Sequence, residues 1–169
     1  MSSLPIQSSE YSNYDDIDQV VSMYANNIFR IAFSRLKNKA DAEDIVQEVF
    51  MRYITNQEKF HDNDEDYRKA WLIRVTINCS NSLLRSAWFK HTTKLEEDIP
   101  IEFIEKSEVY SYVLQLPDKY RTVIHLFYYE ELSIKEISKI LGLKESLVKT
   151  QLHRARKKLK SLCLDLIEF

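Results

Sequence analysis

Glycine and proline are rare in this sequence of 169 residues, which contains one glycine and three prolines. Proteins built from strands and tight turns use both residues at many of their turns. Their scarcity therefore excludes an all-β protein and predicts an all-α fold. The single glycine also excludes a glycine-rich phosphate loop, a dinucleotide-binding fingerprint and a nucleophile elbow, because each of these motifs needs more than one glycine.

Metal-ligand clusters and long apolar runs are also missing. Cys79 and Cys163 lack the spacing of a metal site or of a disulfide framework, and the four histidines are scattered. We therefore expect no metal, no cofactor and no catalytic residue. No apolar run approaches the ~20 residues of a membrane span, and the polar start MSSLPIQSSEYSNYDD is not typical of a signal peptide. The expectation is a cytoplasmic, non-enzymatic protein without membrane insertion.

The net charge of −2 conceals an uneven distribution of charge along the chain. Residues 1–66 carry 13 acidic and 6 basic side chains, whereas residues 67–90 carry five basic side chains and no acidic one. Residues 144–160 carry seven basic side chains, with Glu145 as the single acid. Two basic segments separated by acidic chain predict two separate contacts with nucleic acid.

The clearest pattern lies between Ser133 and Lys160 and predicts a helix-turn-helix. Ser133 can cap the first helix together with Glu136, three residues later, as a capping box. Gly142 then stands where a helix must end in a left-handed residue. Apolar residues recur at helical spacing on both sides of the turn: Ile134, Ile137, Leu141 and Leu143, then Val148, Leu152, Ala155 and Leu159.

The second of these helices is strongly basic. Its outward face suits the major groove of DNA, where lysine and arginine meet phosphates and shorter polar groups reach base edges. A solvated basic face is the alternative, since cations also suit the C-terminal end of a helix dipole. The capped helix and the glycine turn before it favour DNA binding. The candidate residues are Ser146, Lys149, Thr150, His153, Arg154, Arg156 and Lys157.

The first half of the chain begins with a helix predicted from about Asp15 to Leu36. A second helix follows, which Asp41 is expected to cap and which ends near Ile54. On the residues alone, its acidic face is better explained as a solvated surface than as a binding surface. This acidic face presents Asp41, Asp44, Gln47 and Glu48.

A third helix, predicted over Tyr67–Ser86, is apolar on most of its sides, which predicts that it lies at the centre of a three-helix domain. Its polar residues form one narrow line, called the polar stripe below. Arginine and asparagine without an acidic neighbour suit phosphates and bases better than plain water. A line that simply faces solvent is the alternative. The stripe consists of Arg74, Asn78, Asn81 and Arg85.

Composition divides the chain into two small helical domains joined by a linker. Residues 1–14 are expected to form a flexible N-terminus, and residues 15–89 the first domain. Residues 90–106 contain several acidic side chains and Pro100, which predicts a linker. Residues 107–169 are expected to form the second domain, which contains the helix-turn-helix.

Another helix is predicted ahead of the helix-turn-helix in this domain. It covers DKYRTVIHLFYYEE, and Pro117 falls just inside its start, where a missing N–H costs nothing. Its predicted core face consists of Val123, Ile124, Phe127 and Tyr128.

With both halves in view, the chain resembles the sigma-70 family of bacterial RNA polymerase initiation factors. It looks like the small extracytoplasmic-function type, which keeps only the second and fourth conserved domains. DAEDIVQEVF is similar to the polymerase-binding helix of that family, and AWLIRVTIN to its helix beside the −10 element. LPDKYRTVIHLFYYEELSIKEISKILGLKESLVKTQLHRARKKL is similar to the fourth domain almost throughout. The resemblance implies a sigma factor whose partners are core RNA polymerase and promoter DNA.

The resemblance also implies a role for each candidate surface. The acidic face would bind the basic clamp coiled coil of the polymerase large subunit. The polar stripe would hold the opened −10 strand, with Asn78 matching the family's asparagine. Ser82 stands where the family often has Asp or Asn, which leaves the −10 base preference open. The basic helix over 145–160 would read the −35 element as duplex, and an anti-sigma factor is a further candidate partner.

Two other classes of function stay open at this point. One is a free-standing helix-turn-helix regulator that binds an operator without polymerase. The other is a protein-interaction module whose basic helix never meets DNA. The acidic face separates a sigma factor from the free-standing regulator, because only a sigma factor needs it.

Overall fold

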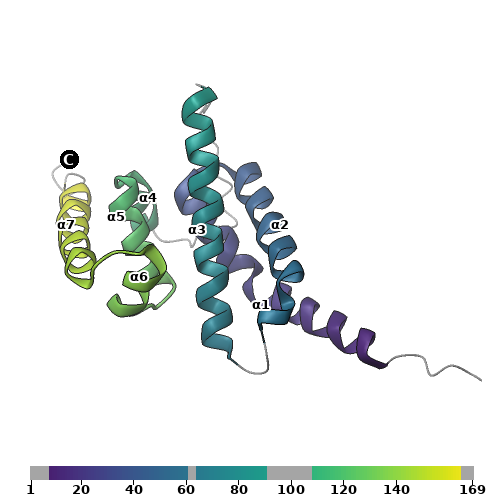
Figure 1. Cartoon of the computed structure of the whole chain (residues 1–169). Coiled ribbons are helices and arrows are strands. Elements are labelled where there is room, and N and C mark those ends of the chain that lie inside the picture. The colour runs from purple at the N-terminus through teal and green to yellow at the C-terminus, as the bar shows by residue number, and fades with distance from the viewer. Residues whose placement is uncertain (1–7, 61–63, 91–107, 165–169) are drawn as a thin grey trace, which may run out of the picture.

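The computed structural model describes residues 8–60, 64–90 and 108–164, and every element in these residues is helical (Figure 1). The expected all-α fold is confirmed. Residues 1–7 of the expected flexible N-terminus lie outside the described residues, as does the expected linker except for Lys90. The elements are α1 (Ser8–Leu36), α2 (Lys39–Thr55), η1 (Gln57–Lys59), α3 (Glu65–Lys90), α4 (Glu108–Gln115), α5 (Asp118–Ile124), η2 (His125–Tyr129), α6 (Ile134–Leu141) and α7 (Glu145–Leu164).

The first three α-helices pack against one another as the first domain (Figure 1). α1 begins at Ser8, seven residues before the expected start, because no glycine or proline in residues 8–14 opposes a helix. The core consists of apolar side chains that recur at helical spacing on one face of each helix. These include Val20, Tyr24, Ile28 and Ile31 of α1, Ile45, Val49, Phe50 and Tyr53 of α2, and Leu72, Ile73 and Ile77 of α3.

The turn between α1 and α2 differs from the expectation in one detail. Asn38 caps α2, not Asp41: the backbone N–H of Asp41 donates a hydrogen bond to the Asn38 side-chain oxygen at 2.9 Å. An N-cap residue has an extended backbone, and Asn38 has it, with φ −135° and ψ 126°. Asp41 already lies in the first helical turn, where the positive end of the helix dipole stabilises its carboxylate.

The second domain consists of α4, α5, η2 and the helix-turn-helix formed by α6 and α7. Both predicted signals of the helix-turn-helix are confirmed. The Glu136 N–H donates to Ser133 Oγ at 3.2 Å, and the Ser133 N–H donates to Glu136 Oε2 at 2.7 Å. Hydrogen bonding of the Glu136 carboxylate to the Ser133 backbone N–H, and secondly to the Ser133 side chain, holds the pKa of Glu136 below its usual value. Gly142 ends α6 in the left-handed region, with φ 65°.

A single π turn, η2, interrupts the segment that was expected to continue as one helix after Pro117. Within it the Glu130 N–H donates to the His125 carbonyl, five residues earlier, at 3.2 Å. The wide turn brings the buried side chains of these two residues together, with His125 Nε2 and Glu130 Oε1 3.4 Å apart. It also turns Tyr128, expected in the core, to the surface, where 51% of the residue is exposed.

Replacing Ser133 by alanine is expected to lower the free energy of unfolding of the second domain by about 1 kcal/mol, because it removes an N-cap acceptor. Urea unfolding followed by far-ultraviolet circular dichroism measures the change. Ser86→Ala is the matched control, since Ser86 is an exposed serine on α3 far from any helix start. If both variants unfold like the parent, the capping box does not stabilise the domain.

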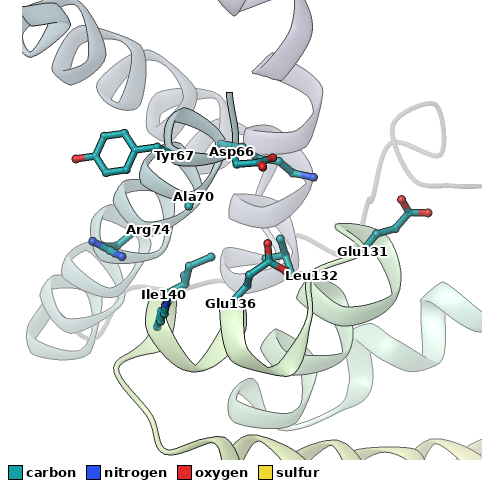
Figure 2. Close-up of a pocket in the computed structure, with 10 residues that line it drawn as sticks. Asp66, Tyr67, Ala70, Arg74, Glu131, Leu132, Glu136 and Ile140 are labelled. Atoms are coloured by element: carbon teal, nitrogen blue, oxygen red, sulfur yellow. The ribbon is translucent and has the colours of Figure 1, made fainter. Parts of the chain in front are cut away.

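The two domains touch each other. α1 packs beside α5, and α3 packs beside α6 (Figure 1). α7 lies on the side of the second domain that faces away from α3, as Figure 1 shows. A pocket of about 430 Å³ lies between α3 on one side and α6 with the segment that leads into it on the other, and Figure 2 shows the side chains around it.

Candidate nucleic-acid and protein interfaces

The outward face of α7 is a continuous row of exposed polar and basic side chains. On the opposite side Val148, Leu152 and Ala155 are buried against the second domain. This burial fixes the rotation of α7 about its axis and therefore the direction of its outward side chains. All seven candidates are exposed: Ser146, Lys149, Thr150, His153, Arg154, Arg156 and Lys157.

Arg156 differs from its neighbours on α7 because it already contacts the protein. Its Nε donates a hydrogen bond to the Tyr128 hydroxyl at 2.7 Å. Its guanidinium lies 5.5 Å from the ring centre of Phe127 and 5.6 Å from that of Tyr128, within the range of cation–π attraction. The π turn thus supplies an aromatic support that orients Arg156 at the edge of the basic face.

The acidic face of α2 is open to a partner. Asp44, Gln47 and Glu48 are exposed, and Asp41 is half-buried. Glu48 forms an ion pair with Arg52, one turn later, at 2.6 Å between Oε1 and Nε. Met51 lies on the same helix with 62% of its surface exposed. An exposed methionine is a residue type enriched at protein interfaces, and exposed carboxylates complement a basic partner surface.

The polar stripe of α3 lies partly on the surface and partly against other elements. Arg74, Asn78 and Arg85 are exposed, whereas Asn81 is half-buried. The side-chain oxygen of Asn81 accepts a hydrogen bond from Nη2 of Arg35, in the last turn of α1. The four residues therefore lie along one helix as expected, but they differ in accessibility.

No role was predicted for Arg35 from the sequence, although its buried side chain bonds to residues of both domains. Its side chain is only 6% exposed. Besides its bond to Asn81, Nη1 donates to Thr122 Oγ1, and Nη2 lies 3.4 Å from Asp118 Oδ2. Burial lowers the pKa of the Arg35 guanidinium, and the Asp118 carboxylate opposes that shift. A signal was present, because Arg35 lies at helical spacing from the buried Ile31 and a buried charge must be paired.

The described part of the chain contains neither a metal-binding cluster nor a membrane-spanning helix. Within residues 8–60, 64–90 and 108–164, no three histidine, cysteine or acidic side chains are grouped so that they could hold a metal ion. No helix in these same residues combines the length and the apolar character that crossing a lipid bilayer requires.

Comparison with known families matches both domains. Residues 20–90 match the family model "Sigma-70 region 2", and residues 106–159 match "Sigma-70, region 4". The first range contains the acidic face and the polar stripe, and the second contains the helix-turn-helix. The match to region 2 sets aside the free-standing regulator, because it assigns the first domain to the same family as the second.

Individual proteins agree with this assignment. The chain is 34% identical over 158 residues to the ECF RNA polymerase sigma factor SigM of Bacillus subtilis, covering 86% of this chain and 94% of that one. It is 31% identical over 181 residues to SigW of the same organism, covering 95% of this chain and 96% of that one.

Two solved structures share the fold. The sigma factor RpoE of Bartonella quintana, in complex with the anti-sigma factor NepR, superposes with a TM-score of 0.74 at 22% identity over 88% of this chain and 96% of that one. CnrH, in complex with the cytosolic domain of CnrY, gives 0.63 at 27% identity over 89% and 88%. The chain belongs to the sigma-70 family of RNA polymerase sigma factors, as a member of its extracytoplasmic-function (ECF) group.

Proposed function

We propose that this sigma factor, which directs RNA polymerase to promoters, divides promoter binding between its two domains. α7 reads the −35 element as duplex, α3 holds the −10 element as a melted strand, and α2 binds the polymerase. The single observation that carries the proposal is the position of the three surfaces. Each candidate surface lies on a separate helix, and each helix is fixed from behind by a buried apolar face.

The proposed −35 contact follows from the shape and charge of α7. The helix is exposed along its outward face and buried along its inward face, so it can enter a major groove without unfolding the domain. Lys149 and Thr150 lie in its first two turns, where recognition helices approach base edges. Arg154 and Lys157 lie further along and are suited to phosphates.

The proposed −10 contact follows from the chemistry of single strands. Unstacked bases need polar groups for their edges and cations for their backbone, and the polar stripe offers both. The helix that carries the stripe, α3, is held in place near its N-terminal end by an aromatic cluster. The ring of Phe60 lies 4.9 Å from that of Tyr53 and 5.1 Å from that of Trp71, measured between centres. The Ser82 hydroxyl donates a hydrogen bond to the Asn78 carbonyl oxygen at 3.0 Å, so the hydroxyl proton of Ser82 is already engaged within the helix.

We assign polymerase binding to the acidic face of α2, through Asp41, Asp44, Gln47 and Glu48, because a basic surface on the polymerase would complement it. An anti-sigma protein is a further proposed partner, since the fold matches that of the sigma factor RpoE solved in complex with the anti-sigma factor NepR. We also propose a cytoplasmic location, because a factor that acts on promoter DNA must be in the compartment that contains the DNA.

A mobility-shift assay on promoter fragments, with and without core polymerase, tests this division of labour. The full chain alone is expected to shift promoter DNA weakly, and the complex with polymerase to shift it strongly and with sequence preference. Equal binding with and without polymerase would contradict the proposal, because promoter recognition would then not depend on the polymerase that α2 is proposed to bind.

Replacing Asn78 by alanine is expected to impair promoter opening, because it removes a polar group for an unstacked base. Permanganate footprinting of thymines near the start site measures opening on duplex promoters. The defect should shrink on a promoter whose −10 region is already melted if Asn78 helps to start opening. Ser86→Ala, on the same helix outside the stripe, is the control. Normal opening by the Asn78 variant would show that the stripe is merely solvated and that the contacts lie elsewhere, for example in residues 55–66.

A further inference from the structure

We propose that Tyr128 and Arg156 together bind one phosphate of the −35 duplex, and that the tyrosine hydroxyl both orients the arginine and donates a hydrogen bond of its own to that phosphate. The proposal rests on the −35 role assigned to α7 above. It adds a DNA contact from outside the recognition helix, because Tyr128 belongs to η2, which precedes the helix-turn-helix in the chain.

The first observation is the way in which Arg156 is held. Its Nε donates to the Tyr128 hydroxyl oxygen at 2.7 Å, and its guanidinium lies 5.5 Å from the ring centre of Phe127 and 5.6 Å from that of Tyr128. The arginine is nevertheless exposed. A long side chain loses rotamer freedom when it binds a partner. Arg156 is already oriented before DNA arrives, so the entropy cost of ordering it on a phosphate is lower.

The hydrogen bond between the two side chains leaves donors free on both of them. A guanidinium has five N–H groups, and this bond uses the one at Nε, so the two terminal nitrogens of Arg156 can face a ligand. A tyrosine hydroxyl that accepts a hydrogen bond still has its own proton to donate. The pair therefore presents several donors and no negative charge, which matches the two free oxygens of a phosphodiester.

The position of the pair on α7 favours a phosphate over a base. Successive residues of an α-helix are rotated by about 100°, so Arg156 points about 80° away from the buried Val148, whereas Lys157 points about 180° away from it. Arg156 therefore lies at the border between the buried and the outward face, beside the body of the domain. When a helix lies in the major groove, its outermost face meets the bases and its borders lie nearest the sugar-phosphate ridges.

The π turn explains why Tyr128 is available for this role. Its wide turn places the tyrosine at the surface, where 51% of the residue is exposed. An exposed ring gives up much of the stabilisation that burial would provide, and π turns frequently occur at functional sites. The ring is oriented by Phe127, which meets it edge to face with the ring centres 5.0 Å apart. The Tyr128 hydroxyl is thus held beside Arg156, where one phosphate can meet both groups.

The test uses the full-length chain in complex with core polymerase, on a duplex promoter in which single phosphates of the −35 element are replaced by uncharged methylphosphonates. Competition binding measures the loss of affinity at each replaced phosphate. Tyr128→Phe removes the hydroxyl and keeps the ring, whereas Arg156→Ala removes the cation. Tyr112→Phe is the matched control, because it removes a tyrosine hydroxyl from α4 of the same domain without breaking the contacts of Arg156.

On the unmodified promoter, Tyr128→Phe is expected to bind about threefold to tenfold more weakly, and Arg156→Ala about tenfold to a hundredfold, because a charged hydrogen bond is stronger than a neutral one. The salt dependence should become shallower for Arg156→Ala alone, since the hydroxyl carries no charge. One methylphosphonate should weaken the parent strongly but Arg156→Ala by less than about twofold, with Tyr128→Phe between them. Tyr112→Phe should match the parent at every phosphate.

Three results would overturn the phosphate site. Parent-like affinity of Tyr128→Phe would mean that its hydroxyl makes no contact with DNA. A weaker Tyr128→Phe with a lower urea midpoint of unfolding and an unchanged methylphosphonate profile would mean that the hydroxyl is only structural. An unchanged profile in Arg156→Ala would place the pair away from any phosphate. The −35 role is tested separately by the parent: if no methylphosphonate in the −35 element weakens its binding, α7 does not bind this duplex, and the proposed function fails together with the site.

Discussion

Exchanging both Asp44 and Glu48 for lysine is expected to weaken binding to core polymerase by roughly tenfold to a hundredfold, because like charges placed opposite each other at an interface cost several kcal/mol. Both side chains are exposed, so the fold should be unaffected. Reversal of Glu48 also removes its ion pair with Arg52, but an exposed pair of this kind contributes little stability. Co-purification with core polymerase, followed by titration, measures the loss.

The matched control for this experiment changes the same amount of charge elsewhere. Glu58 and Glu108 are exposed and lie on η1 and α4, away from the acidic face. Their double replacement by lysine should leave polymerase binding within about twofold of the parent, since it changes only the general field of the protein. If both double variants bind polymerase like the parent, the docking surface is not on α2.

Replacing Lys149 and Thr150 by alanine is expected to relax the choice of −35 sequence, at about 1–3 kcal/mol for each lost base contact. Replacing Arg156 and Lys157 should instead weaken binding to every sequence alike, with a shallower dependence on salt, because phosphate contacts carry no sequence information. Competition binding of the polymerase complex to promoters altered at single −35 positions, at several salt concentrations, separates the two effects.

Two further variants serve as controls for this experiment. Lys119→Ala removes an exposed cation from the same domain but from α5, so it should change neither preference nor salt dependence. Tyr128→Phe removes the hydroxyl that holds Arg156 and leaves the charge in place. A uniform loss in both alanine pairs would contradict the separation of reading from anchoring along α7.

The local structure followed closely from the sequence. A capping box and a glycine turn depend only on residues that are close together in sequence. The structure contains both, at Ser133 with Glu136 and at Gly142. The helical period likewise identified the buried face of α7, whereas Ile54, which the same period placed on the buried face of α2, is 42% exposed. The cap of α2 was misassigned because Asn38 and Asp41 are both good capping residues, and only the backbone angles decide between them.

The errors arose where distant parts of the chain meet. No periodic pattern reveals that Arg35 finds Asn81 on one side and Thr122 on the other, because these residues are far apart in sequence. The stripe was therefore expected as one uniform surface, although its members differ in exposure. Tyr128 was expected in the core for a related reason, since the helical period assumes a regular α-helix and η2 is not one.

The orientation of α7 depends on the number of residues in the π turn at His125–Tyr129. A π turn takes up one more residue than an α turn, so losing one residue here could restore a regular helix. Everything after it would then rotate by about 100° about the helix axis and shift by about 1.5 Å. α6 and α7 would move as one body, because their capping box and glycine turn are internal to it. A deletion in this segment would thus reorient the recognition helix relative to the first domain while leaving every residue of α7 unchanged.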